Sequence, residues 1–227
     1  ASASSEDGAW KLPDGGDYYV ARLKHYTTTD LTPEEIHEIG LVEVERIQTE
    51  MKSIIQQVGF DGSLLEFFDY LRTDDQFVYA NSDAGRNDYI ADATAIINEM
   101  KARLDGLFLT KPEADLVVKR VEPFREDTAF GAFYNSPAPD GSRPGIYYIN
   151  LKDVGEQPKY LQQALAYHEG IPGHHMQIAL AQELEGLPRF RTLGGHTAYI
   201  EGWGLYAESL PDKLGLYTDP YSKFGQL

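Results

Sequence analysis

The sequence predicts a mainly helical protein with a small β-sheet, an α+β chain in which helices dominate. Three observations carry this prediction. Apolar residues recur at helical spacing between residues 32 and 104, in segments with clear start signals. A stretch rich in β-branched and aromatic residues follows, between residues 114 and 151. Beyond residue 157 the helical pattern returns, and this part carries most of the residues with obvious chemistry.

The first 110 residues are expected to form a helical scaffold without chemical function, after a polar and irregular start. The clearest helix start is Thr32-Pro33-Glu34-Glu35. Threonine can cap a helix, proline suits the first helical position, and a glutamate three residues after the cap can bond back to it. Ser63 can cap the next helix. The expected helices cover residues 17–25, 33–58, 64–71 and 87–104.

Residues 114–151 are expected to form the small sheet. Three runs have the composition of strands, at residues 116–121, 129–134 and 146–151. The loop between the second and third runs is dense in proline, glycine, aspartate and serine, which favour turns. The sheet therefore separates the helical scaffold from the helices at residues 157–211, and we expect the whole chain to act as one region.

A helix from residue 160 leads directly into His168-Glu169, and three of the six histidines lie between residues 166 and 177. The usual helical zinc motif places a second histidine four residues after the first, on the same face. Pro172 occupies that position here, so the plain motif is absent. Proline and glycine bend or break a helix, and a distortion at residues 172–173 could return His174 or His175 to the side of His168.

A second helix from residue 197 to residue 211 carries Glu201 and Glu208 on one face. Glu201 is the better ligand candidate because two small glycines follow it and would let another helix approach. A catalytic zinc takes two or three histidine or carboxylate ligands and keeps one position for water. We therefore predict one Zn²⁺ per chain, held by His168, Glu201 and either His174 or His175. The alternative is that the histidines pack or cap helices and the glutamates are solvated.

The segments 168–175 and 201–208 resemble a bacterial family, the domain-of-unknown-function family 885. Residues 26–37 and 141–148 extend the resemblance over most of the chain. Its members are regarded as zinc peptidases related to the mostly helical zincins, so the resemblance implies a zincin-like fold with the sheet beside the metal helix. It also favours His174 over His175, because the family element stresses the Pro-Gly-His step. Members are considerably longer, which implies that residues 1–227 are an interior catalytic-region fragment that contacts the remainder of its own chain.

The activity that follows is zinc-dependent hydrolysis of peptide bonds. Glu169 adjoins a ligand histidine and would take a proton from the attacking water, then return it to the leaving amine. Tyr206 and His196 are candidate donors for the negative charge that develops on the carbonyl oxygen. Two alternatives stay open: a metal-dependent hydrolase of a non-peptide amide or an ester, and a non-catalytic helical module that binds metal structurally.

Substrate contacts are expected from the third predicted strand. In zinc peptidases an edge strand above the metal commonly pairs with the extended substrate. We assign this role to residues 146–150, with Tyr147, Tyr148 and Asn150 as contacts; the alternative is a buried strand. Arg143, in the preceding loop, could grip a substrate carboxylate through its planar guanidinium group.

Composition restricts the partners and the compartment. A net charge of −16 argues against nucleic acid and anionic membranes, which need basic patches. No apolar run approaches the roughly 20 residues that span a bilayer, so we expect no transmembrane segment. The chain has no cysteine, which excludes disulfides and thiolate metal sites. We favour a periplasmic or secreted location, with a lipid anchor in the full-length form, over the cytoplasm, and leave the oligomeric state open.

Overall fold

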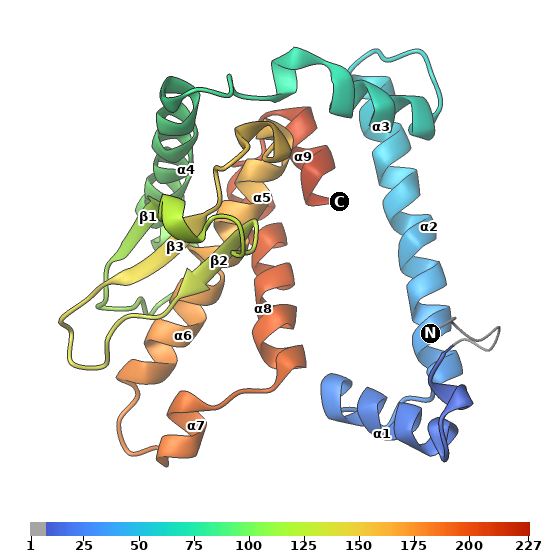
Figure 1. The fold of residues 1–227 in the computed structure, drawn as a ribbon, viewed down its shortest axis with the longest axis vertical. Helices are drawn as coiled ribbons and strands as arrows, with labels where there is room; N and C mark the ends of the chain where they lie inside the picture. Colours follow the sequence, from blue (N-terminus) through green and yellow to red (C-terminus); the bar gives the residue numbers. More distant parts are fainter. Residues whose placement is uncertain (1–7) are drawn as a thin grey trace.

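The computed structural model describes residues 8–227, and it is mostly helical with one three-stranded sheet (Figure 1). The predicted fold class is therefore confirmed, while the expectation for residues 1–7 lies outside the described part of the chain. Within residues 8–227, no helix has the length and apolar character needed to span a membrane. The elements are α1 (Gly15–Thr27), α2 (Pro33–Gln57), α3 (Leu64–Thr73), α4 (Asp83–Arg103), β1 (Leu116–Arg120), β2 (Ala132–Asn135), β3 (Gly145–Ile149), α5 (Lys159–Glu169), α6 (His174–Glu183), α7 (Arg189–Leu193), α8 (Thr197–Ser209) and α9 (Pro220–Gln226).

Capping residues set the starts of the scaffold helices. The Thr32 hydroxyl accepts a hydrogen bond from the Glu35 N–H at 3.1 Å, and the Glu35 carboxylate accepts one from the Thr32 N–H at 2.8 Å. Ser63 and Glu66 form the same reciprocal pair at the start of α3. Helix α4 begins four residues earlier than expected, because the Ser82 hydroxyl caps it. These caps satisfy backbone donors that the helices themselves leave free.

The sheet has the strand order β1-β3-β2, so β3 is the central strand. It pairs in parallel with β1 and antiparallel with β2. All five of its residues are buried, which agrees with its unbroken apolar run. The expectation that residues 146–150 form an edge strand is wrong, because the backbone of β3 is hydrogen-bonded on both sides. The edge strands are β1 and β2.

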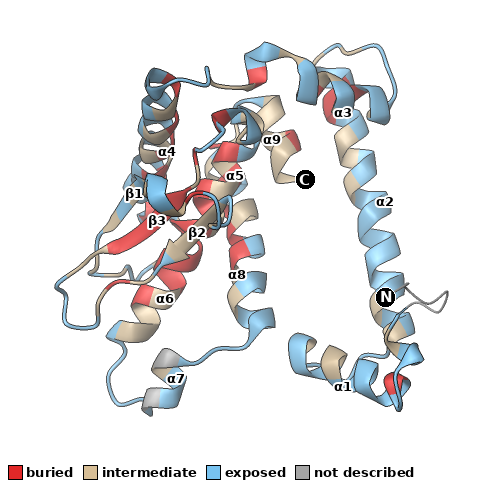
Figure 2. Cartoon of the chain, in the orientation of Figure 1, coloured by how far each residue is buried: buried red, intermediate tan, exposed pale blue. Residues whose placement is uncertain are grey.

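The main core lies between α4, β3, α5 and α6. Met100 from α4, Tyr147 and Ile149 from β3, and Tyr167 from α5 are all completely buried within it. Figure 2 shows buried residues on β3, α5 and α6, in the left half of the view. Because α5 and α6 rest on this core, the histidines at their adjoining ends are held on a rigid base.

A second core joins α2 and α3 to α9, a helix that the sequence analysis did not predict. Ile54 from α2, Phe67 from α3 and Phe224 from α9 are its buried centre. The rest of α2 stands apart from α8 and is largely exposed (Figures 1 and 2). Ile39 and Val42 on this exposed part are 53% and 56% accessible. Helix α2 therefore presents apolar side chains to solvent along much of its length.

Candidate metal centre

A sharp turn separates the two helices that carry the histidines. Helix α5 ends one residue after His168, and α6 begins at His174, with a cis peptide bond between Ile171 and Pro172 in the turn. The start of α6 is packed tightly against the end of α5, because a Cβ atom on Gly173 would lie 1.9 Å from the His168 carbonyl oxygen. The turn brings the imidazole rings of His168 and His174 to 4.6 Å between centroids. The distortion expected at residues 172–173 is thus a complete break in the helix.

Helix α8 brings a carboxylate to the two histidines. The Trp203 indole donates a hydrogen bond to the Pro172 carbonyl at 2.9 Å, which ties α8 to the turn. Gly204 then lies directly against the His168 ring, since a Cβ atom there would be 2.6 Å from its Cε1. This close approach places Glu201, nearly one helical turn earlier, opposite both imidazoles. The expectation that small residues in α8 permit such an approach holds at Gly204.

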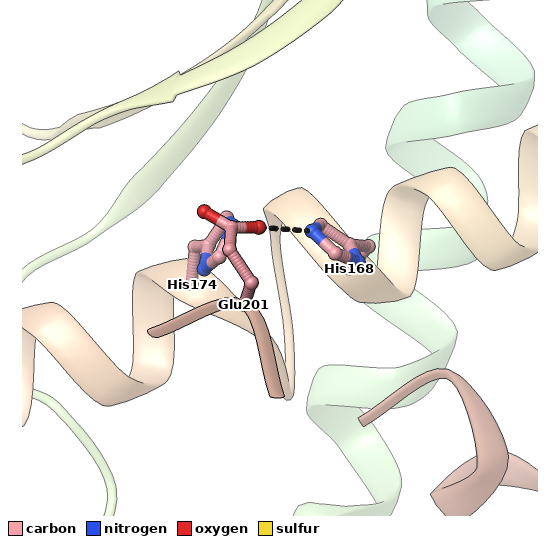
Figure 3. Close-up of side chains that lie close together, drawn as sticks. All are labelled: His168, His174 and Glu201. Atoms are coloured by element: carbon pink, nitrogen blue, oxygen red, sulfur yellow. Dashed lines mark ion pairs between the residues drawn. The ribbon is translucent and has the colours of Figure 1, made fainter. Parts of the chain in front are cut away.

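Three potential ligand atoms converge between α5, α6 and α8 (Figure 3). The Oε2 atom of Glu201 is 3.5 Å from Nε2 of His168 and 3.5 Å from Nε2 of His174. These distances exceed those of good N–H···O hydrogen bonds. Both are close to the edge of a zinc coordination tetrahedron, which is about 3.3–3.4 Å for bonds of about 2.0–2.1 Å, and the three ligand atoms all lie within 4.8 Å of one another. The residues present therefore fit a single zinc ion.

Glu208 fixes the orientation of His168. Its Oε1 atom lies 2.7 Å from His168 Nδ1. An ionised carboxylate can only accept, so Nδ1 carries a proton, and Nε2 is the ring nitrogen that faces Glu201. The same hydrogen bond is the largest cause of the raised pKa of His168 in the metal-free protein. Such carboxylate–histidine pairs are typical of metal sites. The sequence analysis placed Glu208 on the correct face and did not predict this role.

His174 is buried, and its surroundings favour the neutral imidazole. It is 7% accessible, and burial is the main reason that its pKa lies below the usual value. Among the residues that the structure describes, none forms a hydrogen bond with its Nδ1 atom. Metal binding requires a neutral imidazole, so burial of His174 favours the form that a cation needs.

Glu169 lies beside the three potential ligand residues, in a pocket of about 290 Å³. Its carboxyl group is almost completely buried, and burial is the main reason that its pKa is raised to about 7. The Glu201 carboxylate raises the pKa further, whereas the charge of His168 and a hydrogen bond from the Tyr134 backbone N–H lower it. A carboxyl group with a pKa near neutrality can both accept and donate a proton under physiological conditions.

His175, the alternative second histidine, lies outside the group of converging ligand atoms. Its side chain is 1% accessible. Nδ1 is 3.0 Å from the Tyr134 hydroxyl and Nε2 is 3.0 Å from the Ala114 carbonyl oxygen. Both ring nitrogens are therefore occupied by protein groups. Of the two candidates, the structure brings His174 to His168 and Glu201.

The expected oxyanion donors do not reach the pocket. His196 is exposed and precedes the first residue of α8. Tyr206 is 49% accessible, and its ring packs against the Trp203 ring and lies below the Lys213 ammonium group. Neither residue belongs to the pocket lining that contains Glu169. On α8, Tyr206 is turned away from the face that carries Glu201.

The expected substrate contacts have structural partners instead. Arg143 donates to two backbone carbonyl groups of its own loop. Tyr147 is buried in the main core, Tyr148 stacks on Phe133 at 5.1 Å, and the Asn150 amide donates to two carbonyl groups. On the sheet side, the pocket is lined by Phe133 and Tyr134, which both belong to β2. Strand β3 contributes no residue to this lining and lies between β2 and β1. The sequence analysis predicted a strand at residues 129–134, where β2 lies, but it did not assign β2 a place at the pocket.

Several solved structures resemble this chain, and two of them are described below. No functionally curated protein matches it. One is described as "the putative lipoprotein from Colwellia psychrerythraea"; it is 40% identical, with a TM-score of 0.93 over 99% of this chain and 39% of that one. The other, "a putative lipoprotein of unknown function from Shewanella oneidensis", is 20% identical, with a TM-score of 0.69 over 92% of this chain and 40% of that one, and supports the fold alone. This chain spans about two fifths of both. The model of the family "Bacterial protein of unknown function (DUF885)" matches residues 1–227, and the chain belongs to that family.

Proposed function

We propose that this chain is the catalytic region of a zinc-dependent hydrolase that cleaves peptide bonds. The observation that carries the proposal is the spacing of His168, His174 and Glu201, whose ligand atoms fit one ion beside a buried glutamate. Three protein ligands leave a fourth position for water, as in catalytic zinc sites. Zinc held there supplies a Lewis acid, which acidifies a water molecule and polarises the scissile carbonyl group.

Glu169 is the proposed general base. It takes a proton from the attacking water and later donates it to the leaving amine. Its pKa of about 7 supports both steps, because the group exchanges protons readily near neutral pH. Burial restrains the carboxylate, which lines the pocket beside Tyr134 of β2. Glu169 is adjacent to a ligand in sequence but lies outside the convergent set of ligand atoms.

The substrate is proposed to bind along β2, in place of the role first expected for β3. Strand β2 pairs with β3 on one side only, and Phe133 and Tyr134 line the pocket that contains the potential metal ligands. An extended peptide can add to such a free edge through backbone hydrogen bonds. Its scissile bond would then pass between β2 and the convergent ligands. This arrangement favours a peptide over a compact substrate, because a peptide can use the whole strand.

The test uses the purified full-length protein. We expect about one zinc per chain by elemental analysis, peptide hydrolysis that stops on chelation, and recovery when zinc is added back. His168→Ala should abolish zinc retention, whereas His37→Ala, which changes an exposed histidine on α2, is the matched control and should not. A protein that holds no stoichiometric transition metal, and whose stability and activity do not respond to zinc, refutes the proposal.

Two other functions share the same residues. A hydrolase of esters or non-peptide amides would use the same metal chemistry, and a substrate panel that includes both classes separates it from a peptidase. A non-catalytic module would hold its metal through four protein ligands with no open position. The described residues contribute a group of three, which favours catalysis.

We also propose that the chain works as part of a longer protein located outside the cytoplasm. The relatives extend well beyond the matched region. Exposed apolar side chains such as Ile39 and Val42 on α2 and Leu205 on α8 would be covered by the additional residues. The description of the Colwellia relative as a "putative lipoprotein" supports a periplasmic or secreted location with a lipid anchor. Fractionation of the native bacterium with detection of the protein in each fraction tests the location.

A further inference from the structure

His175 lies where helix α6, strand β2 and the segment before β1 meet. Its Nε2 faces the Ala114 carbonyl at 3.0 Å and its Nδ1 faces the Tyr134 hydroxyl at 3.0 Å. A carbonyl group can only accept, so Nε2 carries the proton. Nδ1 is then an acceptor, and the Tyr134 hydroxyl donates to it. The ring is neutral and almost inaccessible to water, so these two hydrogen bonds fix its position.

Gly145 at the start of β3 makes room for this junction. A Cβ atom on Gly145 would lie 2.5 Å from His175 Nδ1 and 2.8 Å from the Tyr134 hydroxyl oxygen. Any side chain at position 145 would therefore push the two hydrogen-bonded atoms apart. The backbone of β3 at Gly145 thus lies directly against the His175 ring and the Tyr134 hydroxyl group, which leaves these two side chains little freedom to move.

Tyr134 connects the junction to the pocket. Its hydroxyl is held by His175 on α6. Tyr134 also lines the pocket together with Glu169 at the end of α5, and its backbone N–H lowers the pKa of that carboxyl group. His174, which precedes His175 in the first turn of α6, supplies one of the three convergent ligand atoms. One tyrosine thus spans the distance between the proposed base and the helix that carries a proposed ligand.

We infer that His175 is a positioning residue, which holds Tyr134 and thereby sets the position of Glu169 relative to the ligands on α6. The inference rests on the proposed hydrolytic function and deepens it. His175 contributes no ligand atom to the convergent group and does not line the pocket. Its effect on the reaction is geometric, and a displacement of about 1 Å at a reacting group can cost about 100-fold in rate.

The experiment compares the zinc-loaded full-length protein with Tyr134→Phe, His175→Ala and the double variant. Each single change should lower kcat for a peptide by about 10- to 100-fold and leave zinc affinity, measured by competition with a chromophoric chelator, unchanged. The double variant should be no slower than the slower single variant, because the two residues act as a unit. His175→Asn, which returns an acceptor near the position of Nδ1, should recover part of kcat.

Hydrogen exchange of the β2 amides gives a second readout that does not depend on hydrolysis. We expect faster exchange in Tyr134→Phe and His175→Ala than in the wild type. Tyr79→Phe is the matched control, because it removes a tyrosine hydroxyl that bonds Asp92 and Gln162 outside the pocket. It should change neither kcat nor β2 exchange. Because Tyr134→Phe removes one hydroxyl group only, it decides the matter even if His175→Ala does not fold.

Three results overturn the inference: zinc affinity that falls in parallel with kcat, additive losses in the double variant, or unchanged kcat despite faster β2 exchange. A wild-type protein that holds zinc and hydrolyses no substrate refutes the proposed function instead. In that case the hydrogen-exchange data still test one part of the inference, namely that His175 holds β2 through Tyr134. Faster exchange in Tyr134→Phe supports the link, and unchanged exchange rejects it.

Discussion

Replacing Gly204 with alanine should remove the metal without altering any ligand. The new Cβ atom would lie 2.6 Å from Cε1 and 2.8 Å from Nε2 of His168, and ordinary contacts begin at 3.4 Å. The ring must therefore move by about 0.8 Å, whereas metal–ligand distances tolerate about 0.2 Å. Loss of a group that merely orients a ligand costs about 10- to 100-fold in metal affinity. Displacement of His168 itself should cost at least about 100-fold.

The effect of Gly204→Ala on folding stability should be small, so a loss of zinc binding in this variant cannot be explained by unfolding. Alanine in place of a helical glycine gains about 0.5–1 kcal/mol, and overpacking against a ring costs about 1–3 kcal/mol. The two partly cancel for Gly204→Ala. Gly202→Ala, two residues earlier in α8, is the matched control, because nothing lies within 4 Å of the Cβ atom that it adds. It should raise the melting temperature of the metal-free protein by about 1–4 °C.

Zinc affinity is measured by competition with a chromophoric chelator, and stability by thermal unfolding of the metal-free forms. Gly202→Ala should bind zinc as the wild type does, and Gly204→Ala should bind it at least about 100-fold more weakly. Wild-type affinity in Gly204→Ala would show that the His168 ring does not need the space beside α8. The assignment of His168 as a ligand would then be refuted, together with the geometry on which the proposed function depends.

The remaining predictions concern the residues around the same ion. Glu169→Gln should retain zinc while peptide hydrolysis falls by about 10²- to 10⁴-fold; near wild-type hydrolysis with metal bound contradicts the mechanism. His174→Ala should lower zinc affinity by more than the roughly 10- to 100-fold that a second-layer group can cost, whereas His175→Ala should leave it unchanged; the opposite order in a chelator titration exchanges their roles. Glu208→Ala should weaken zinc binding by about 10- to 100-fold, because His168 loses its orienting partner; an unchanged affinity rules out that function.

Local signals in the sequence predicted much of the fold. The capping residues Thr32 and Ser63 and the apolar spacing behind them define α2 and α3 well, because a helix depends mostly on nearby residues. The place of β3 within the sheet was missed. Its unbroken run of apolar residues is consistent with a strand buried on both faces, yet strand order depends on pairing between distant segments. Helix α9 was missed because its cap, Asp219, precedes a run too short to show a period.

The candidate site was predicted in part. His168 and Glu201 are suggested by residue type and spacing, but spacing alone could not choose between His174 and His175, because the choice depends on the backbone path through the turn. Glu208 had a detectable signal, since it lies two helical turns after Glu201 on the same face. Tyr134 had none. Its contact with Glu169 arises from the register of β2 against β3 and the packing of both on the helices.

The second core has a consequence for synthesis of the chain on the ribosome. Phe67 on α3 packs against Phe224 on α9, with ring centroids 4.8 Å apart, although the whole sheet and the whole candidate metal region lie between them in the sequence. Translation adds about 5–20 residues per second, so the apolar faces of α2 and α3 stay uncovered for roughly 10–30 s before α9 is synthesised. During that interval they are a natural binding site for chaperones that recognise apolar segments. Truncation before α9 should therefore prolong chaperone association of the nascent chain.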